Sequence, residues 1–504
     1  MTTGTRIRVD APGRLQGLPR FPGWAAALTL GGLGFLTSFV GSGIPSLWGD
    51  EAASVLSAER SLPSLFRMLG RVDAVHGTYY VFLHFWIGLF GTSPVALRFP
   101  SAIAAGLIVA GVFVLATMLA DRRLGILSAA ICAVLPRTLI MGGEARSYAL
   151  STALAVWLTI LLVTLVKRRD TRRLIWLGYG LALAIGLYLF LYLALLIPAH
   201  ASYVLFRSRR PLARRRWVQG TLFAAILASP IIYFGYRERA QIAFLTHRNY
   251  ATFPNITTDE WFGGPSPWFA LLAWALILVA VGAVVRTAWQ HRWVSPIALL
   301  SLTWLILPTV LLLAMNLVSP TYNIRYLSQS DPAAAIVIGM GILALRRRWV
   351  MIAATVITFV VAIPFDIGTR SPYAYNGSDW AQVSSYVHTI ARPDEAVVFD
   401  DSTRPSLRPR LALRMYPAEW RGIADLELTT PYNRTSWLWD RTASLDEVAP
   451  RLDTVTRVLA VELEGSRDQT SHTDVDTLED LGFTLRHTRV IDNTVIYQLT
   501  RGES

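Results

Sequence analysis

The chain has 504 residues, of which 53% are hydrophobic and 16% charged, and its mean hydropathy is +0.41. Soluble domains carry about 25% charged residues, so this composition excludes an ordinary soluble protein and predicts a polytopic α-helical membrane protein. The net charge of +13 is uneven: residues 1–365 hold 12 acidic and 32 basic residues, whereas residues 366–504 hold 22 acidic residues and 15 arginines. The single cysteine, Cys132, lies in an apolar run and excludes an internal disulfide or a cysteine metal site.

Eleven apolar segments come close to the length, about 20 residues, that crosses a bilayer. The first follows an arginine-rich stretch and is longer than the apolar part of a signal peptide, so we interpret it as an uncleaved helix. The predicted transmembrane segments are 23–44, 101–120, 124–142, 147–167, 174–190, 191–206, 217–236, 266–286, 294–316, 331–345 and 349–365.

Basic loops fall on one side of this arrangement, and the positive-inside rule assigns that side to the cytoplasm. We therefore expect a multi-pass protein of the plasma (inner) membrane with a cytoplasmic N-terminus. An odd number of spans places the C-terminal part outside. Since the basic excess lies in short loops, topology accounts for it and no nucleic-acid partner is expected.

The segment Tyr79 to Gly91 is apolar but has only 13 residues. If it crossed the membrane, every later basic loop would change sides. It is therefore predicted to be a helix lying at the outer interface.

The chain is predicted to divide at residue 365 into a transmembrane module, 1–365, and a soluble α/β extracytoplasmic domain, 366–504, joined by a linker from Pro364 to Gly377. A helix is predicted from Ser378 to Ile390, with Ser378-Asp379 as its cap. Short buried strands are predicted for 395–400 and 457–462, and a hairpin turning at Asp492-Asn493 follows.

Two adjacent carboxylates, Asp50 and Glu51, stand in the outer loop after the first span. Charges near hydrocarbon are costly and usually functional. A second interpretation is that Asp50 only caps the helix that follows it, and this role is compatible with catalysis.

The predicted topology gathers further polar residues on the outer side, where an active site needs acid/base groups and charge stabilisers together. Some of these polar residues also have a simpler interpretation. Arg98 could be a snorkelling anchor, Glu144 and Arg146 an interfacial ion pair, and His76 a surface histidine. His247 lies in a 28-residue outer loop, 237–264, of a length that is often functional. The set comprises Asp50, Glu51, His76, Arg98, Glu144, Arg146, Tyr148, His247, Arg325 and Tyr326.

The sequence contains no GxxxxGK[ST] loop, no HExxH, no GxSxG with triad partners and no clustered Cys/His set. Nucleotide-driven transport and zinc proteolysis therefore have no support. No metal ligands are assigned, because no set of residues in the sequence demands a metal ion. A divalent cation near the carboxylates is compatible with the sequence.

Several short stretches follow one another along the chain: 48–52, 76–80 leading into 83–86, 97–101, 144–150, 325–326 with Asp331-Pro332, 379–380 and 395–400. In their order and spacing they resemble the GT-C glycosyltransferases. The likeness is to the protein O-mannosyltransferase and lipid A aminoarabinose transferase superfamily, in its actinobacterial form, and it extends over nearly the whole chain. One departure is His76-Gly77-Thr78, where many relatives have His-Pro-Pro or Lys-Pro-Pro.

The resemblance implies a sugar donor attached to a polyprenyl phosphate, transferred with inversion outside the cytoplasm to a glycolipid, glycan or protein acceptor. Asp50, helped by Glu51, is expected to act as the base. The lipid phosphate is expected to contact Arg325, Arg146, Arg98, His247 and Tyr326, since guanidinium groups match phosphate oxygens. Residues expected to shape the substrate site are His76, Glu144, Tyr148 and Tyr79.

Three alternatives stay open at this stage. Arabinosyl transfer in cell-wall assembly fits these residues as mannosyl transfer does, and mannose is favoured only by resemblance. A transporter or flippase would carry charges near the midplane of its spans, whereas the ionisable residues here collect at the span ends. A scaffold whose outer domain binds a partner is the third.

Overall fold

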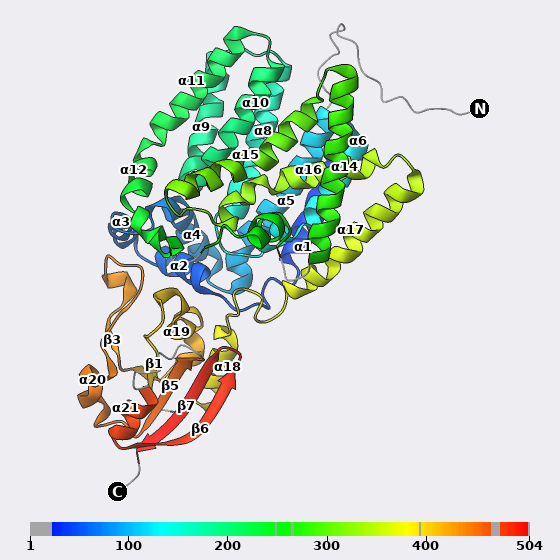
Figure 1. Cartoon of the computed structure of the whole chain (residues 1–504). Helices are drawn as coiled ribbons and strands as arrows, with labels where there is room; N and C mark the ends of the chain where they lie inside the picture. Colours follow the sequence, from blue (N-terminus) through cyan, green and yellow to red (C-terminus); the bar gives the residue numbers. More distant parts are fainter. Residues whose placement is uncertain (1–22, 247–248, 264–266, 393–394, 465–473, 502–504) are drawn as a thin grey trace.

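A computed structural model describes residues 23–246, 249–263, 267–392, 395–464 and 474–501. It consists of a large helical bundle and a smaller α/β unit that contains the C-terminal residues (Figure 1). Three elements, α2 (Gly49–Ala58), α3 (Leu62–Leu69) and α4 (Gly77–Phe90), lie at the end of the bundle that faces the α/β unit.

Within the described ranges, the bundle contains six helices that are long and apolar enough to cross a bilayer, or eight if two bent helix pairs each count as one span. The remaining three predicted segments correspond to shorter apolar helices. The six are α5 (Pro94–Leu119), α8 (Tyr148–Lys167), α14 (Pro267–His291), α15 (Pro296–Val318), η5–α16 (Ile324–Ala344) and α17 (Arg348–Gly368). The bent pairs are α6–α7 (Arg122–Val134, Pro136–Gly142) and α11–α12 (Pro211–Leu227, Ser229–Arg237), and the shorter helices are α1 (Trp24–Phe39), α9 (Arg173–Leu189) and η2–α10 (Leu191–Arg207).

The start of α5 differs from the prediction. Ser93 accepts a hydrogen bond from the Ala96 N–H and Pro94 follows in the first turn, so the helix begins at residue 94 rather than 101. This places Arg98 inside the helix, fully buried, and not at a membrane-facing end. The interpretation of Arg98 as a snorkelling anchor is therefore wrong.

Helix α4 coincides with the segment that was too short to span a membrane, and its 14 residues form one continuous helix. Tyr80 and Leu83 are completely buried on the face that packs against α2.

Within the bundle, α9 and α11 pack very closely: a Cβ at Gly180 would lie 2.3 Å from the carbonyl oxygen of Gly220. Glycine therefore lets the two backbones meet.

The C-terminal unit is built on a five-stranded sheet of order β2-β1-β5-β7-β6, beside a two-stranded pair, β3-β4. The predicted buried strands are β1 (Ala396–Phe399) and β5 (Arg457–Leu463), which pair in parallel. The predicted hairpin is β6 (Phe483–Ile491) with β7 (Thr494–Arg501). The short strands are β2 (Ala424–Asp425), β3 (Leu428–Thr430) and β4 (Arg441–Thr442).

Two local predictions for this part of the chain are wrong. Helix α17 continues through Pro364 to Gly368, so the predicted linker begins within a helix. The predicted helix is α18 (Trp380–Ile390), but the Asp379 carboxylate does not cap it. That carboxylate instead accepts hydrogen bonds from the Asn493 N–H at 3.0 Å and the Thr494 hydroxyl at 2.9 Å, which joins α18 to the hairpin.

The α/β unit is attached directly to the chain that leads into α2. The Leu47 N–H donates to the Tyr416 hydroxyl at 2.9 Å, and the Ala381 N–H donates to the Ser46 hydroxyl at 3.1 Å. Arg60, just after α2, donates from Nη1 to the carbonyl of Thr435 at 2.9 Å. One buried apolar cluster includes side chains of α2, α4 and the sheet. Helix α2 and the α/β unit therefore lie on the same side of the bundle.

Candidate active site

The first turn of α2 carries the two adjacent carboxylates. The helix begins at Gly49, after Trp48 in extended conformation, and no side chain caps its first turn. Asp50 is therefore a first-turn residue, and the capping role considered for it is wrong. Successive side chains of an α-helix point about 100° apart, so Asp50 and Glu51 face different surroundings.

Asp50 forms an ion pair with Arg325 from η5 (Ile324–Ser330). Arg325 Nη1 donates to Asp50 Oδ2 at 2.6 Å, and both side chains are partly exposed, by 29% and 35% respectively. The Arg325 guanidinium also lies 4.5 Å from the centre of the Trp48 ring. This cation–π contact fixes the arginine beside the carboxylate. The two residues predicted as base and first phosphate ligand are thus brought together.

Arg146, between α7 and α8, contacts the main chain of Asp50. Its Nη1 donates to the Asp50 carbonyl at 3.1 Å and to the Ser54 hydroxyl at 3.2 Å, and its Nη2 donates to His76 Nε2 at 3.3 Å. Its Nε is buried and has no hydrogen-bond partner among the described residues.

Glu51 has a different environment from its neighbour. Arg98 Nε and Nη2 donate to its two carboxylate oxygens at 2.8 and 2.6 Å, and both side chains are completely buried. The Ala145 N–H donates to the same carboxylate at 2.8 Å. The remaining Arg98 donors bind the carbonyls of Ser42, Pro45 and Ser46.

All five N–H groups of Arg98 are thus used within the protein. The expected contact of Arg98 with a lipid phosphate is not compatible with this arrangement. Glu51 likewise has no contact with solvent in this structure. The pair connects α2 to α5 and to the segment before α8, and so holds the first turn of α2 in place.

Glu144 lies two residues before Arg146, but no ion pair joins them among the described contacts. Its side chain is buried, and its Oε2 has no hydrogen-bond partner within the described part of the chain. Burial raises the pKa of Glu144 to about 7, although the positive charge of Arg325 opposes the shift. Glu144 therefore exchanges a proton near neutral pH beside the arginine that pairs with Asp50.

His76 ends the short helix η1 (Ala74–His76). Burial, together with the adjacent Arg146, holds its pKa well below the usual range, so the imidazole is neutral and accepts the hydrogen bond from Arg146. It is not the surface histidine that the simpler interpretation assumed.

Asp73 was not identified from the sequence. It has a left-handed backbone (φ 60°), accepts a hydrogen bond from the Tyr80 hydroxyl at 2.8 Å, and is held through its N–H by Gln241 at 3.2 Å. Burial raises its pKa, and Arg146 partly offsets this. Its position three residues before His76 was the available signal.

Aromatic rings form one wall of the site. Tyr326 stacks on Tyr192 with ring centres 4.2 Å apart, and Phe190 contacts both Tyr326 and Tyr148. Tyr148 also lies 5.9 Å from the Arg146 guanidinium. Tyr79, which is expected to shape the substrate site, is buried in the apolar cluster around α2 and α4.

The expected role of His247 falls outside the described residues. Across the described ranges, no group of three or more His, Cys, Asp or Glu side chains is arranged to hold a metal ion.

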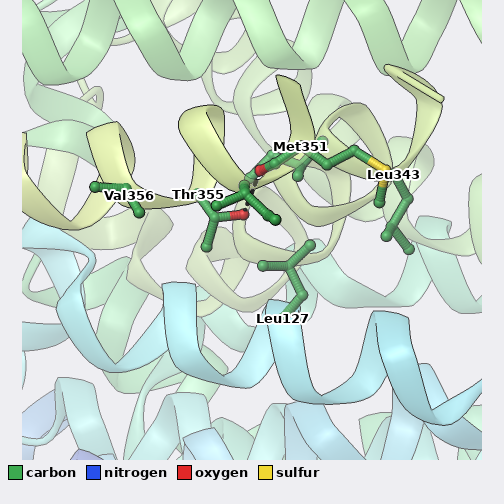
Figure 2. Close-up of a pocket in the computed structure, with 7 residues that line it drawn as sticks. Leu127, Leu343, Met351, Thr355 and Val356 are labelled. Carbon is green, nitrogen blue, oxygen red and sulfur yellow. Dashed lines mark hydrogen bonds between the residues drawn. The ribbon is translucent and has the colours of Figure 1, made fainter. Parts of the chain in front are cut away.

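An apolar recess of about 240 Å³ lies between α6, α16 and α17 (Figure 2). Its lining, Leu127, Ile342, Leu343, Met351, Ile352, Thr355 and Val356, includes no titratable side chain and so has no part in acid/base chemistry.

Comparison with known proteins identifies a family match for part of the chain and a shared fold for nearly all of it. Residues 78–234 match the family described as dolichyl-phosphate-mannose-protein mannosyltransferase. This range includes Arg98, Glu144 and Arg146 but neither Asp50 nor Arg325. A search of curated proteins finds no match.

Two solved structures of ArnT from Cupriavidus metallidurans share the fold over almost the full length of both chains. The apo form has a TM-score of 0.56 at 12% identity and covers 94% of this chain and 98% of that one. The form bound to undecaprenyl phosphate has a TM-score of 0.54 at 12% identity, covering 95% and 98%. The chain thus shares the fold of these ArnT structures, and its residues 78–234 match the mannosyltransferase family.

Proposed function

We propose that this protein is an inverting glycosyltransferase that moves a sugar, with mannose favoured, from a polyprenyl-phosphate donor to an extracytoplasmic glycolipid, glycan or protein acceptor. The observation that carries the proposal is the convergence of Arg325 and Arg146 on Asp50, at the partly exposed first turn of α2. A carboxylate paired with one guanidinium group, with a second guanidinium bound to the main-chain carbonyl of the same residue, suits a reaction that takes a proton from an acceptor and releases a phosphate.

The reaction follows from these groups. The acceptor hydroxyl oxygen attacks the anomeric carbon, and Asp50 takes the hydroxyl proton. The bond between the anomeric carbon and the phosphate oxygen breaks, and its electron pair stays on the leaving lipid phosphate. Arg325 and the unpartnered Nε of Arg146 stabilise that growing negative charge. General-base help of this kind gives about 10²–10⁴-fold in rate.

The ion pair suggests how donor binding prepares the base. In this structure Asp50 holds Arg325. A phosphodiester that enters between the arginines competes for Arg325 and releases the carboxylate to face the acceptor. The aromatic wall of Tyr148, Phe190, Tyr192 and Tyr326 suits the sugar ring or the first isoprene units of the donor. The mechanism uses no metal step.

The proposed orientation has the N-terminus in the cytoplasm and both α2 and the α/β unit outside, in the plasma membrane. Its supports are the charge bias of the loops and the contacts of α2 with the α/β unit. A donor carried by a lipid is consistent with this orientation, because an exoplasmic site has no access to sugar nucleotides.

The test is transfer by purified protein in liposomes, with polyprenyl-phosphate mannose and polyprenyl-phosphate arabinose as alternative donors and envelope extract as acceptor. Wild-type protein should transfer one sugar, and the productive donor separates mannosyl from arabinosyl transfer. Asp50→Asn should lose at least 100-fold in turnover while it retains donor binding. Asp446→Asn, an exposed carboxylate of the α/β unit, is the matched control. Near-normal turnover of Asp50→Asn would remove Asp50 from the role of base.

A further inference from the structure

A second cavity lies where the α/β unit meets the start of α2. It has a volume of about 290 Å³ and is lined by three parts of the chain: the approach to α2 (Trp48 and Gly49), the turn 376–380, and loops of the sheet that contribute Arg404, Glu464 and Asn493. Ligand sites often occur at such junctions between structural units.

The ring of Trp48 connects the cavity with the proposed reacting groups. Trp48 lines it and also contacts the Arg325 guanidinium at 4.5 Å, and Arg325 pairs with Asp50. Trp48 is only 5% exposed, and its indole N–H has no hydrogen-bond partner among the described residues. A buried donor that lacks a partner is costly, so this N–H indicates that a ligand oxygen belongs nearby.

The walls of the cavity are held rigidly. A Cβ at Gly49 would lie 2.2 Å from the carbonyl oxygen of Ser406, so α2 and the loop 404–407 are in direct backbone contact. On the other wall, Asn376 and Gly377 both have left-handed backbones, and the Asn493 side-chain amide donates to the Gly377 carbonyl at 2.8 Å. A preorganised site of this kind loses little entropy when it binds a ligand.

The chemistry of the lining is mixed. It offers two indoles, two side-chain amides, one guanidinium and two carboxylates, so donors and acceptors are both present. This set suits a ligand with many hydroxyl groups and one apolar ring face. The volume is near the lower limit of ligand pockets, about 300 Å³, which fits one or two sugar rings.

We propose that this cavity binds a saccharide unit of the acceptor and presents its neighbouring hydroxyl to Asp50. The inference rests on the proposed function, and it assigns to the acceptor the class of carbohydrate. A peptide acceptor is the competing class, and it is an outcome of the test.

The experiment uses the full-length protein in liposomes with the productive lipid donor. The acceptor probes are octyl α-mannoside, octyl β-arabinofuranoside and a threonine-containing peptide. The variants are Arg404→Ala and Glu464→Gln, whose side chains are exposed and whose replacement should leave folding intact, as thermal unfolding will verify. Matched controls are Arg421→Ala and Glu479→Gln, exposed residues of the same unit that do not line the cavity.

The expected result is glycoside transfer with an acceptor KM raised about five- to tenfold in each cavity variant, as the loss of one hydrogen bond predicts, and an unchanged donor KM. Cavity variants that behave like the controls would overturn the inference. Transfer to the peptide and to neither glycoside would overturn it in favour of a protein acceptor. If wild-type protein transfers to nothing, the proposed function itself fails, and this outcome is recognised without any variant.

Discussion

Arg325 and Asp50 are 275 positions apart in the chain, yet Arg325 Nη1 donates to Asp50 Oδ2 at 2.6 Å. The contact joins η5, at the entrance to α16, with the first turn of α2. Because the two side chains keep about a third of their surface exposed, a ligand can reach the pair. This accessibility distinguishes it from the Glu51–Arg98 pair one residue away, which is completely buried.

Removing the Arg325 guanidinium should weaken donor binding. Hydrogen bonds to charged groups contribute about 1.5–3 kcal/mol, so Arg325→Ala should raise the Kd for the lipid-linked sugar roughly ten- to hundredfold. Arg325→Lys should recover part of the affinity, since it keeps the charge without the bidentate geometry. Equilibrium binding of a labelled donor measures both, with Arg421→Ala as control. An Arg325→Ala protein with wild-type affinity would contradict the phosphate contact.

The buried Glu51–Arg98 pair should matter for stability. Arg98→Met leaves the Glu51 charge unpaired, which costs about 3–5 kcal/mol, and it should lower the midpoint of thermal unfolding in detergent. The double variant Glu51→Leu with Arg98→Met removes both charges and should unfold at a higher temperature than Arg98→Met alone. Arg172→Ala breaks an ion pair of the same 2.6 Å length on the surface and should unfold like wild type. Equal midpoints for the single and double variants would argue against this account.

Donor affinity should fall as pH rises through about 7. The raised pKa of Glu144 means that its carboxyl is neutral below this pH and charged above it. The charged form adds a negative group beside Arg325 and opposes binding of a phosphodiester, which stays ionised throughout. Donor Kd should therefore be several-fold higher at pH 8 than at pH 6, and Glu144→Gln should bind equally at both. A pH dependence that survives in Glu144→Gln would assign it to another group.

Gly49→Ala tests whether the contact between α2 and the loop 404–407 aligns the site. The added Cβ would meet the Ser406 carbonyl at 2.2 Å, and neither backbone can give way without moving the first turn of α2. We expect a loss of turnover of at least tenfold, although no reacting group is changed, since small misplacements of catalytic groups are costly. Gly282→Ala, in α14, has no atom within 4 Å of its new Cβ and should be active. Equal activities of the two variants would refute the alignment.

Apolar length and charge bias predicted most of the bundle, because spans and loops differ strongly in composition. That Asp50 and Arg325 lie in one site was expected only because both were placed on the outer side; their ion pair was not predicted, since no local pattern joins residues so far apart. Arg98 was misjudged because a capped start seven residues upstream moved it from a helix end into the interior. Asp73 was missed because a single carboxylate in a loop carries no periodic signal; its closeness to His76 in the sequence was the available signal, and in the structure the left-handed backbone and the Tyr80 contact distinguish it.

The attachment of the C-terminal unit to the chain before α2 has a practical consequence for protein engineering. Leu47 and Ser46 are held by Tyr416 and Ala381 from that unit, so the unit cannot be exchanged as an independent module. In a chimaera with a homologue, residues 42–60 and 369–501 should come from the same parent, so that both sides of this contact match. Truncation of the chain after α17 would remove the contacts that hold the segment before α2, and the remaining bundle should have no transferase activity.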